Sequence, residues 1–148
     1  LGLRLGEKDL LPGVIENLTG NVLFHGIQVK PGMPTMLSVV KGTPVLSLSG
    51  NPFAVEALFE VLAGGYLTDM EASRYLQKNQ MKILKQTFVK TGKMKRIVKG
   101  RCDESGVYLP QIQKNGQLKN GIGSNCLVIF PEGERTYAEG EAVRVIRI

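Results

Sequence analysis

The segment Val45–Ala54 reads VLSLSGNPFA, an apolar run interrupted by Gly-Asn-Pro and followed by a second apolar stretch. This pattern predicts a short strand, a tight turn and the start of a helix. Gly50 permits a turn that a Cβ would obstruct, Asn51 is a favoured N-cap, and Pro52 suits the first helical position. Since helix starts with unpaired N–H groups attract anions, the segment predicts an oxyanion or phosphate site. The alternative is a structural turn that connects the strand to the helix and binds no ligand.

A second rigid turn, KPGMP at Lys30–Pro34, lies upstream and begins with a cation. A cationic loop beside an anion-binding helix start favours a ligand that carries a phosphate or an oxyanion. An exposed loop lysine without a ligand is the other interpretation of Lys30, since most lysines lie at the surface.

Composition excludes several classes of protein. The chain has 148 residues, of which 43% are hydrophobic and 22% charged, so it is globular. Its apolar runs are too short for a bilayer span, and its first residues do not resemble a signal peptide. With one histidine and two distant cysteines, Cys102 and Cys126, no zinc ligand set can be assembled. We therefore expect free thiols in a reducing cytoplasm, with Cys126 as a small buried hydrophobe.

The formal net charge is +6, and much of the excess lies between Lys78 and Arg101. Phe88 is the one aromatic residue within this run, which argues against base stacking and nucleic acid. We expect a solvated face or a rim that attracts an anionic ligand. A small RNA-binding β domain at residues 80–148 is a weaker alternative. The basic cluster comprises Lys82, Lys85, Lys90, Lys93, Lys95, Arg96 and Lys99.

Hydrophobic periodicity divides the chain into an α/β part, residues 1–78, and a β part, residues 79–148. The first part is predicted to contain helices at 8–18, 52–62 and 69–80, strands at 22–29 and 35–40, a turn at 41–42 and a buried strand at 43–48. The helix at 52–62 has an apolar stripe formed by Val55, Leu58, Phe59 and Leu62. The second part is predicted to contain short antiparallel strands at 86–89, 106–110, 126–130 and 142–148.

These segments resemble the molybdopterin molybdenumtransferase family, which includes bacterial MoeA and the gephyrin E domain. That family carries a Lys-Pro-Gly-Lys-Pro loop and a Pro-Gly-Asn-Pro turn, which are similar to the segments at 22–34 and 44–54. Near the end of the chain, GIGSNCLVIFPEG at 121–133 and EGEAVRVI at 139–146 resemble the end of the family's small β domain. The resemblance covers most of the chain in the right order.

The resemblance implies part of a three-layer molybdopterin-binding α/β domain followed by a small all-β, barrel-like C-terminal domain. It implies an enzyme that inserts molybdate into adenylylated molybdopterin, with Mg²⁺ as cofactor and release of AMP. It also implies a cytoplasmic homodimer in the intact protein, without nucleic-acid or membrane partners.

The implied site combines the two loops with one carboxylate. Lys30 would contact the oxyanion or phosphate as a catalytic and binding residue, with Asp9 as a second catalytic group and as the carboxylate that holds the metal. Asp9 could instead cap the helix that begins near Leu10, and Asn51 could cap its own helix rather than touch the ligand. The remaining ligand-binding positions are Pro31, Gly32, Gly50, Asn51 and Pro52.

Several positions depart from the family pattern. Met33 replaces the second loop lysine, Ser49 replaces the first proline of the later turn, and Ala54 lies where many members have serine. The family's Gly-Gly-x-Ser-x-Gly loop is missing, with LGLRLG at 1–6 in its place. We therefore expect a truncated portion that needs further N-terminal parts for activity, or an inactive scaffold or relic of the family.

Two further positions carry weaker expectations. His25 follows Phe24 at the end of a predicted strand, with no acidic partner nearby in the sequence, which favours a structural role over a catalytic one. Lys114-Asn115-Gly116 lies where the family often has a turn near the ligand, and a plain hairpin turn is the stronger interpretation.

Overall fold

The computed structural model describes residues 9–63, 78–110 and 123–148, and the chain divides into two compact units, residues 1–58 and 59–148. No described helix is long and apolar enough to cross a membrane. The predicted division between residues 78 and 79 stays a prediction, because residues 64–77 beside it lie outside the described residues.

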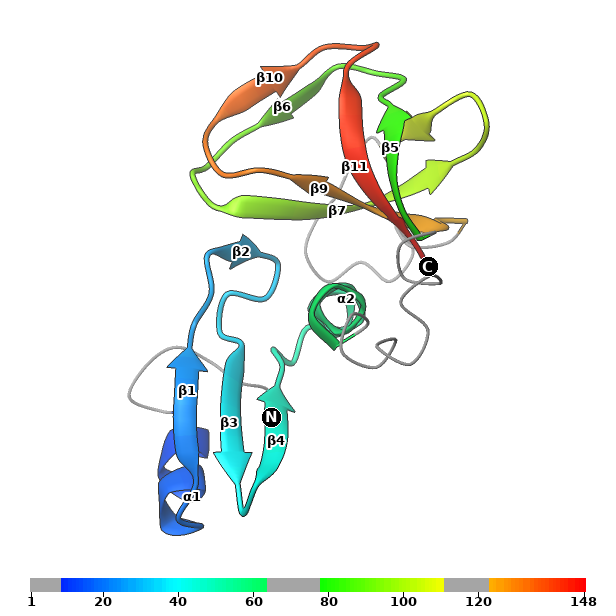
Figure 1. Cartoon of the computed structure of the whole chain (residues 1–148). Helices are drawn as coiled ribbons and strands as arrows, with labels where there is room; N and C mark the ends of the chain where they lie inside the picture. Colours follow the sequence, from blue (N-terminus) through cyan, green and yellow to red (C-terminus); the bar gives the residue numbers. More distant parts are fainter. Residues whose placement is uncertain (1–8, 64–77, 111–122) are drawn as a thin grey trace. The chain divides into compact units, whose positions relative to one another are not determined.

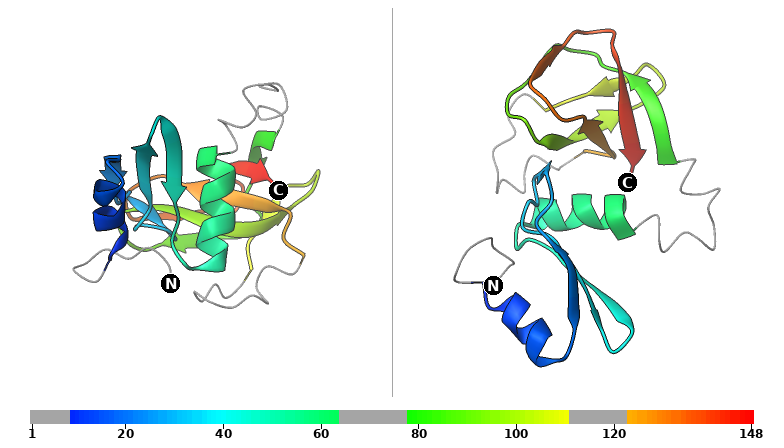
Figure 2. Two further views of the ribbon diagram at one scale, coloured as in Figure 1. Left: turned by 90° about the horizontal axis from the view of Figure 1, so that it is seen from below. Right: turned by 60° about the vertical axis from the view of Figure 1, so that its left-hand side comes forward.

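The first unit is built around an antiparallel sheet of strand order β1–β3–β4 (Figure 1). Helix α1 lies beside β1 (Figure 2), where buried Ile15 and Met36 form a small core with partly buried Leu11, Val22 and Val40. The elements are α1 (Leu11–Asn17), β1 (Asn21–His25), β2 (Val29–Lys30), β3 (Met36–Val40), β4 (Thr43–Ser47) and α2 (Pro52–Leu58).

Two strand predictions in this unit need correction. The strand expected at 22–29 ends at His25, because Gly26 adopts φ +96° and turns the chain away before β2 begins. The strand expected to be buried at 43–48 is exposed to half-buried, because β4 lies at the edge of the three-stranded sheet. The predicted turn at Lys41–Gly42 is confirmed, and both residues adopt the positive φ that a tight hairpin of this type requires.

Helix α2 continues as a wider π-helical turn, Phe59–Ala63. Of the predicted apolar stripe, Leu58 is buried, whereas Val55, Phe59 and Leu62 are exposed. The buried face of α2 consists of Ala54, Ala57 and Leu58. Small alanine side chains allow the helix backbone to approach its neighbours more closely than a stripe of large residues would.

The second unit is an antiparallel β structure with strand order β7–β9–β11–β5. Short β8 extends it beside β7, while β6 and β10 form a separate two-stranded ladder. The strands are β5 (Asn79–Ile83), β6 (Phe88–Lys90), β7 (Lys95–Cys102), β8 (Val107–Tyr108), β9 (Cys126–Phe130), β10 (Arg135–Tyr137) and β11 (Ala142–Arg147).

The four strands predicted in this part of the chain are confirmed as β6, β8, β9 and β11, with shifts of a few residues. The polar helix predicted at 69–80 does not extend to its expected end, because Asn79 and Gln80 pair in β5 with β11. Residues 69–77 lie outside the described residues. An isolated bridge between Leu84 and Val107 links the two ends of the sheet, and the described ladders form no closed barrel.

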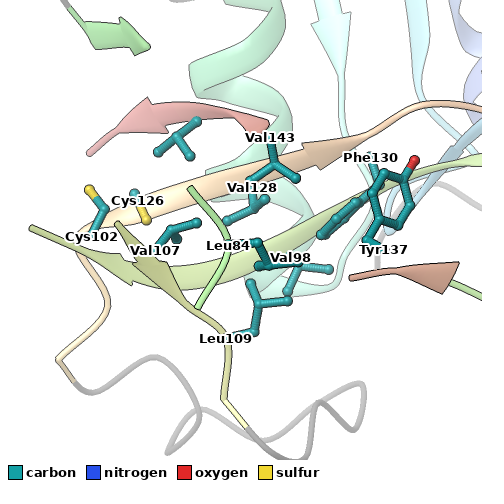
Figure 3. Close-up of a cluster of buried hydrophobic side chains, with 11 residues drawn as sticks. Leu84, Val98, Cys102, Val107, Leu109, Cys126, Val128, Phe130, Tyr137 and Val143 are labelled. Carbon is teal, nitrogen blue, oxygen red and sulfur yellow. The ribbon is translucent and has the colours of Figure 1, made fainter. Parts of the chain in front are cut away.

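A large cluster of buried side chains lies on one face of this sheet (Figure 3). Phe130 lies at one end, with its ring 4.5 Å from Phe88 and 4.8 Å from Tyr137 between centroids. The buried members are Leu84, Val98, Cys102, Val107, Leu109, Cys126, Val128, Phe130, Tyr137, Val143 and Val145. Cys126 is buried as predicted, and both thiols are free.

One member of the predicted solvated basic cluster is buried. Lys90 is 1% exposed, and its ammonium donates hydrogen bonds to the carbonyl oxygens of Gly92 and Gly133. A buried ammonium group is tolerated when carbonyl acceptors replace the water it loses. Lys90 therefore has a structural role in joining two turns, whereas Lys93 and Lys95 are exposed as expected.

Candidate functional site

The loop between β1 and β3 has a defined internal structure. Its base is closed by a hydrogen bond from Gly26 N–H to the Thr35 carbonyl, 2.8 Å, and by a second from Ile27 N–H to the Met33 carbonyl, 2.9 Å. Buried Thr35 donates its hydroxyl to the Gly32 carbonyl at 2.7 Å. These bonds hold the loop that carries Lys30, whose side chain is exposed.

Gly32 brings the two predicted loop segments together. A Cβ built at this position would lie 2.1 Å from Leu58 Cδ1 and 3.6 Å from Ala54 Cβ, both on the buried face of α2. Gly32 also adopts φ +105°, a conformation that favours glycine. The Lys30 loop and helix α2 are therefore neighbours within the first unit, as a shared ligand site would require.

The start of α2 is capped by Asn51, as one of the two predicted roles of this residue requires. Its side-chain Oδ1 accepts hydrogen bonds from Phe53 N–H at 3.0 Å and Ala54 N–H at 3.3 Å. Val55 N–H donates to the Asn51 carbonyl, as in a regular helix. The Ser49 hydroxyl oxygen in turn accepts from Asn51 N–H at 3.4 Å, so serine is compatible with this turn in place of proline.

This cap changes the predicted chemistry of the helix start. Pro52 has no N–H group, and the N–H groups of the next three residues donate within the protein. The prediction of unpaired N–H groups at this helix start is therefore wrong for the arrangement that the structure shows. An anion could reach the N–H groups of Phe53 and Ala54 only by displacing the Asn51 carboxamide.

Asp9 lies before α1 and contacts both Leu11 and His25. Its Oδ1 accepts a hydrogen bond from Leu11 N–H at 3.1 Å, which agrees with the predicted capping role. Its Oδ2 lies 3.6 Å from Nε2 of His25. His25 thus has an acidic partner although none lies near it in the sequence, because the fold brings the residue before α1 next to the end of β1. Sixteen positions separate the two residues in the chain, so no local pattern indicates this pair.

The residues that the structure describes contain no group of three or more histidine, cysteine, aspartate or glutamate side chains that could hold a metal ion. The predicted role of Asp9 as a metal ligand therefore stays a prediction. Two other predicted features, the turn at 114–116 and the segment at 1–6, lie outside the described residues.

Sequence reasoning missed Thr35, and it favoured a structural role for His25 without identifying its partner Asp9. Thr35 follows the KPGMP turn directly, and its hydroxyl satisfies a carbonyl inside that turn. A threonine immediately after a Gly- and Pro-rich turn was the available signal, because its hydroxyl can bond to nearby backbone groups. For His25 the contact to Asp9 depends on tertiary structure.

Comparison with known proteins supports the resemblance. Residues 2–69 match the family model described as a probable molybdopterin binding domain. The chain is 26% identical over 150 residues to the molybdopterin molybdenumtransferase of Staphylococcus aureus strain COL, covering 98% of this chain and 36% of the relative. The corresponding protein of Staphylococcus epidermidis RP62A is 23% identical over the same length.

Solved structures give the same picture. A molybdopterin biosynthesis MoeA protein from Pyrococcus horikoshii superimposes with a TM-score of 0.75 and 28% identity over 93% of this chain and 34% of that chain. A molybdenum cofactor biosynthesis protein from Pyrococcus furiosus shares the fold, with a TM-score of 0.64 and 22% identity. The chain spans about a third of the length of the relatives it matches. Its sequence and its fold are thus similar to part of the MoeA-like molybdopterin molybdenumtransferases.

Proposed function

We propose that this chain is the portion of a MoeA-like protein that contributes the Lys30 loop to a ligand site in molybdenum cofactor biosynthesis. The reaction of the whole protein would be the insertion of molybdate into adenylylated molybdopterin with release of AMP. The observation that carries this proposal is the close packing of Gly32 against Ala54 and Leu58 of α2. It joins the two loops that the family resemblance assigns to one site.

In this proposal Lys30 supplies the positive charge. Its exposed ammonium can donate three hydrogen bonds and approach a phosphate or molybdate oxygen as a point charge. Pro31 and Gly32 give the loop its shape and its close approach to α2. Gly50, Asn51 and Pro52 form the facing turn. Since the first amides of α2 already donate to Asn51 and its carbonyl, the main attraction for an anion comes from Lys30 rather than from the helix.

The family resemblance also assigns Mg²⁺ to Asp9, and the arrangement of this carboxylate does not fit that assignment. One oxygen is bonded to Leu11 N–H and the other faces His25, while the side chain is 7% exposed. Mg²⁺ requires octahedral oxygen ligands and retains several waters, which needs an accessible carboxylate. The metal role of Asp9 stays a prediction, and the proposal assigns no step to a metal.

The wider assignments follow from the same proposal. The substrates are small molecules, molybdopterin in its adenylylated form and molybdate, and the intact protein is a homodimer. The β unit at 79–148 would be the family's barrel-like domain, to which the bridge between Leu84 and Val107 lends support. Buried free thiols at Cys102 and Cys126 support a reducing compartment, the cytoplasm.

Isothermal titration with adenylylated molybdopterin and then with molybdate tests this proposal, after circular dichroism has established that the chain is folded. We expect binding that is lost in Lys30→Ala, because the variant removes the one charge of the loop. The matched control is Lys93→Ala, an exposed lysine of the second unit, which should bind like the unaltered chain. Equal binding by both variants would contradict the role of Lys30.

A second candidate function is an interaction module that has kept the fold and lost the chemistry. Met33 and Ala54 favour it, because methionine and alanine offer fewer polar contacts than the lysine and the serine of the family pattern. The Asn51 cap favours it as well, since the amides at the helix start are already used. A folded chain that binds neither ligand in the titration would support this second function.

A further inference from the structure

The pair formed by Asp9 and His25 joins two segments of the first unit that are far apart in the chain. Asp9 precedes α1, and His25 is the last residue of β1, immediately before the loop that carries Lys30. The side chain of Asp9 is 7% exposed and that of His25 is 25% exposed. The pair is therefore largely shielded from water, where an interaction between a carboxylate and an imidazole is stronger than at the surface.

The two oxygens of the Asp9 carboxylate have different contacts. Asp9 Oδ1 is already used by Leu11 N–H, so Oδ2 is the oxygen that faces Nε2 of His25 at 3.6 Å. Nε2 is buried and has no hydrogen-bond partner among the described residues, so the Asp9 carboxylate is the polar group that compensates its burial. A buried polar atom left without such compensation costs stability.

The loop base begins at the next residue. Gly26 N–H donates to the Thr35 carbonyl and Ile27 N–H to the Met33 carbonyl, and these two bonds close the Lys30 loop. His25 directly precedes Gly26, whose φ of +96° turns the chain out of β1. The contact between Asp9 and His25 therefore lies next to the two bonds that close the loop.

We propose that His25 is a positioning residue that holds the Lys30 loop closed through its contact with Asp9. The inference deepens the proposed function, since it concerns how the Lys30 loop of that site is kept in place. It is tested without any ligand, so its outcome is independent of whether the chain binds molybdate or adenylylated molybdopterin.

Hydrogen exchange of backbone amides, followed by NMR, measures the closing of the loop directly. In His25→Ala we expect the Gly26 and Ile27 amides to exchange about fivefold faster, because the loop base opens more often once the contact is lost. His25→Gln keeps an N–H donor near Asp9 and should restore exchange to within about twofold. If His25→Ala acted only by destabilising the whole unit, His25→Gln would not restore slow exchange.

A double-mutant cycle shows whether the two residues act through each other. Asp9→Asn removes the charge but keeps an oxygen acceptor for Leu11 N–H, and it should speed exchange of the same two amides. The variant with both His25→Ala and Asp9→Asn should exchange no faster than either single variant, since the contact is lost once. Leu23→Ala on β1 and Glu16→Gln on α1, both exposed, are matched controls and should leave these amides unchanged.

Amides of β3 and β4 report whether the first unit is folded in each variant, and amides of β9 and β11 are the reference in the second unit. Unchanged exchange at Gly26 and Ile27 in a folded His25→Ala variant would overturn the inference. If the increases in exchange rate caused by the two single changes multiply in the double variant, the two residues act independently, and the inference is overturned as well. Failure of His25→Gln to slow exchange would show that the imidazole acts by packing alone, which is also contrary to the inference.

Discussion

Among the described residues, the second unit has a cluster of eleven buried residues on its sheet, whereas the first unit buries five hydrophobic side chains, Ile15, Met36, Ala54, Ala57 and Leu58. Burial of apolar surface scales with the number of such residues, so the β unit has the larger hydrophobic stabilisation. The first unit depends more on particular local contacts: the Gly32 approach to α2, the Asn51 cap and the bonds that close the Lys30 loop.

This difference has a consequence for function. Regions that open at low free energy have few buried apolar contacts and are often those that bind ligands. The residues proposed to meet the ligand lie in the unit with the smaller core, and the residues of the larger core carry no proposed chemistry. Substitutions should therefore affect stability most in the second unit and ligand binding most in the first.

Phe130→Ala should have the largest effect on stability. Phe130 is fully buried between Phe88 and Tyr137, and removing its ring leaves a cavity that costs about 3–5 kcal/mol. Denaturant unfolding followed by circular dichroism measures this loss. Val89→Ala, a 62% exposed neighbour in β6, should change the free energy of unfolding by less than about 0.5 kcal/mol. A small effect of Phe130→Ala would remove the contrast between the units.

Gly32→Ala tests the close packing in the first unit. The new methyl group would overlap Leu58, and the backbone would remain at a positive φ, so we expect a loss of about 2 kcal/mol or more. Gly42→Ala is a matched control, since Gly42 also has a positive φ but no atom within 4 Å of the added Cβ. If the two changes cost the same, the approach of the loop to α2 contributes nothing beyond backbone strain.

The dependence of stability on pH tests the burial of Cys126 in the larger core. Burial of the Cys126 thiol, with neighbouring Cys102 as a second cause, raises its pKa from 9.0 to about 12. Between these values the unfolded chain loses a proton that the folded chain keeps, so stability is complete below pH 9 and falls above it, by about 1.4 kcal/mol per pH unit.

Unfolding curves at pH 8 and pH 10 measure this slope, and Cys126→Ala is the comparison. The variant should be less sensitive to pH over this range, although its stability at pH 8 is lower because a buried side chain has been shortened. An equal dependence on pH in both proteins would assign the alkaline loss of stability to other groups.

Asn51→Ala should have the smallest effect, a loss of about 1 kcal/mol, since it removes one side-chain cap from α2. Asn51→Asp keeps an acceptor oxygen at the same position and should retain most of this stability. Thermal unfolding followed by circular dichroism compares the three proteins. A larger loss in Asn51→Asp than in Asn51→Ala would contradict the capping role.

Local chemistry made some features predictable from the sequence. The Asn51 cap and the Lys41–Gly42 turn follow from the conformations that these residue types favour, and strand β9 follows from its apolar run. The segments of the candidate site could also be named, because Pro restricts the backbone and Gly permits tight turns wherever they occur.

Features that depend on tertiary packing could not be predicted. Of the apolar stripe that periodicity predicted for α2, Leu58 is buried, whereas the other large side chains are exposed and Ala54 lies beside Gly32 instead. Lys90 was expected to be exposed to water, as lysines usually are. Only the fold supplies the two carbonyl oxygens that accept hydrogen bonds from its buried ammonium group. The pairing of Asp9 with His25 likewise depends on where α1 and β1 meet.

The most direct test of the account is a titration of the ¹⁵N-labelled chain with adenylylated molybdopterin, followed residue by residue by NMR. The account predicts that the largest shifts occur at Lys30, Gly32 and Asn51, with the amides of β7 and β9 little changed. Shifts confined to the basic residues of β7, Lys95–Cys102, would contradict it, because they would assign ligand recognition to the second unit.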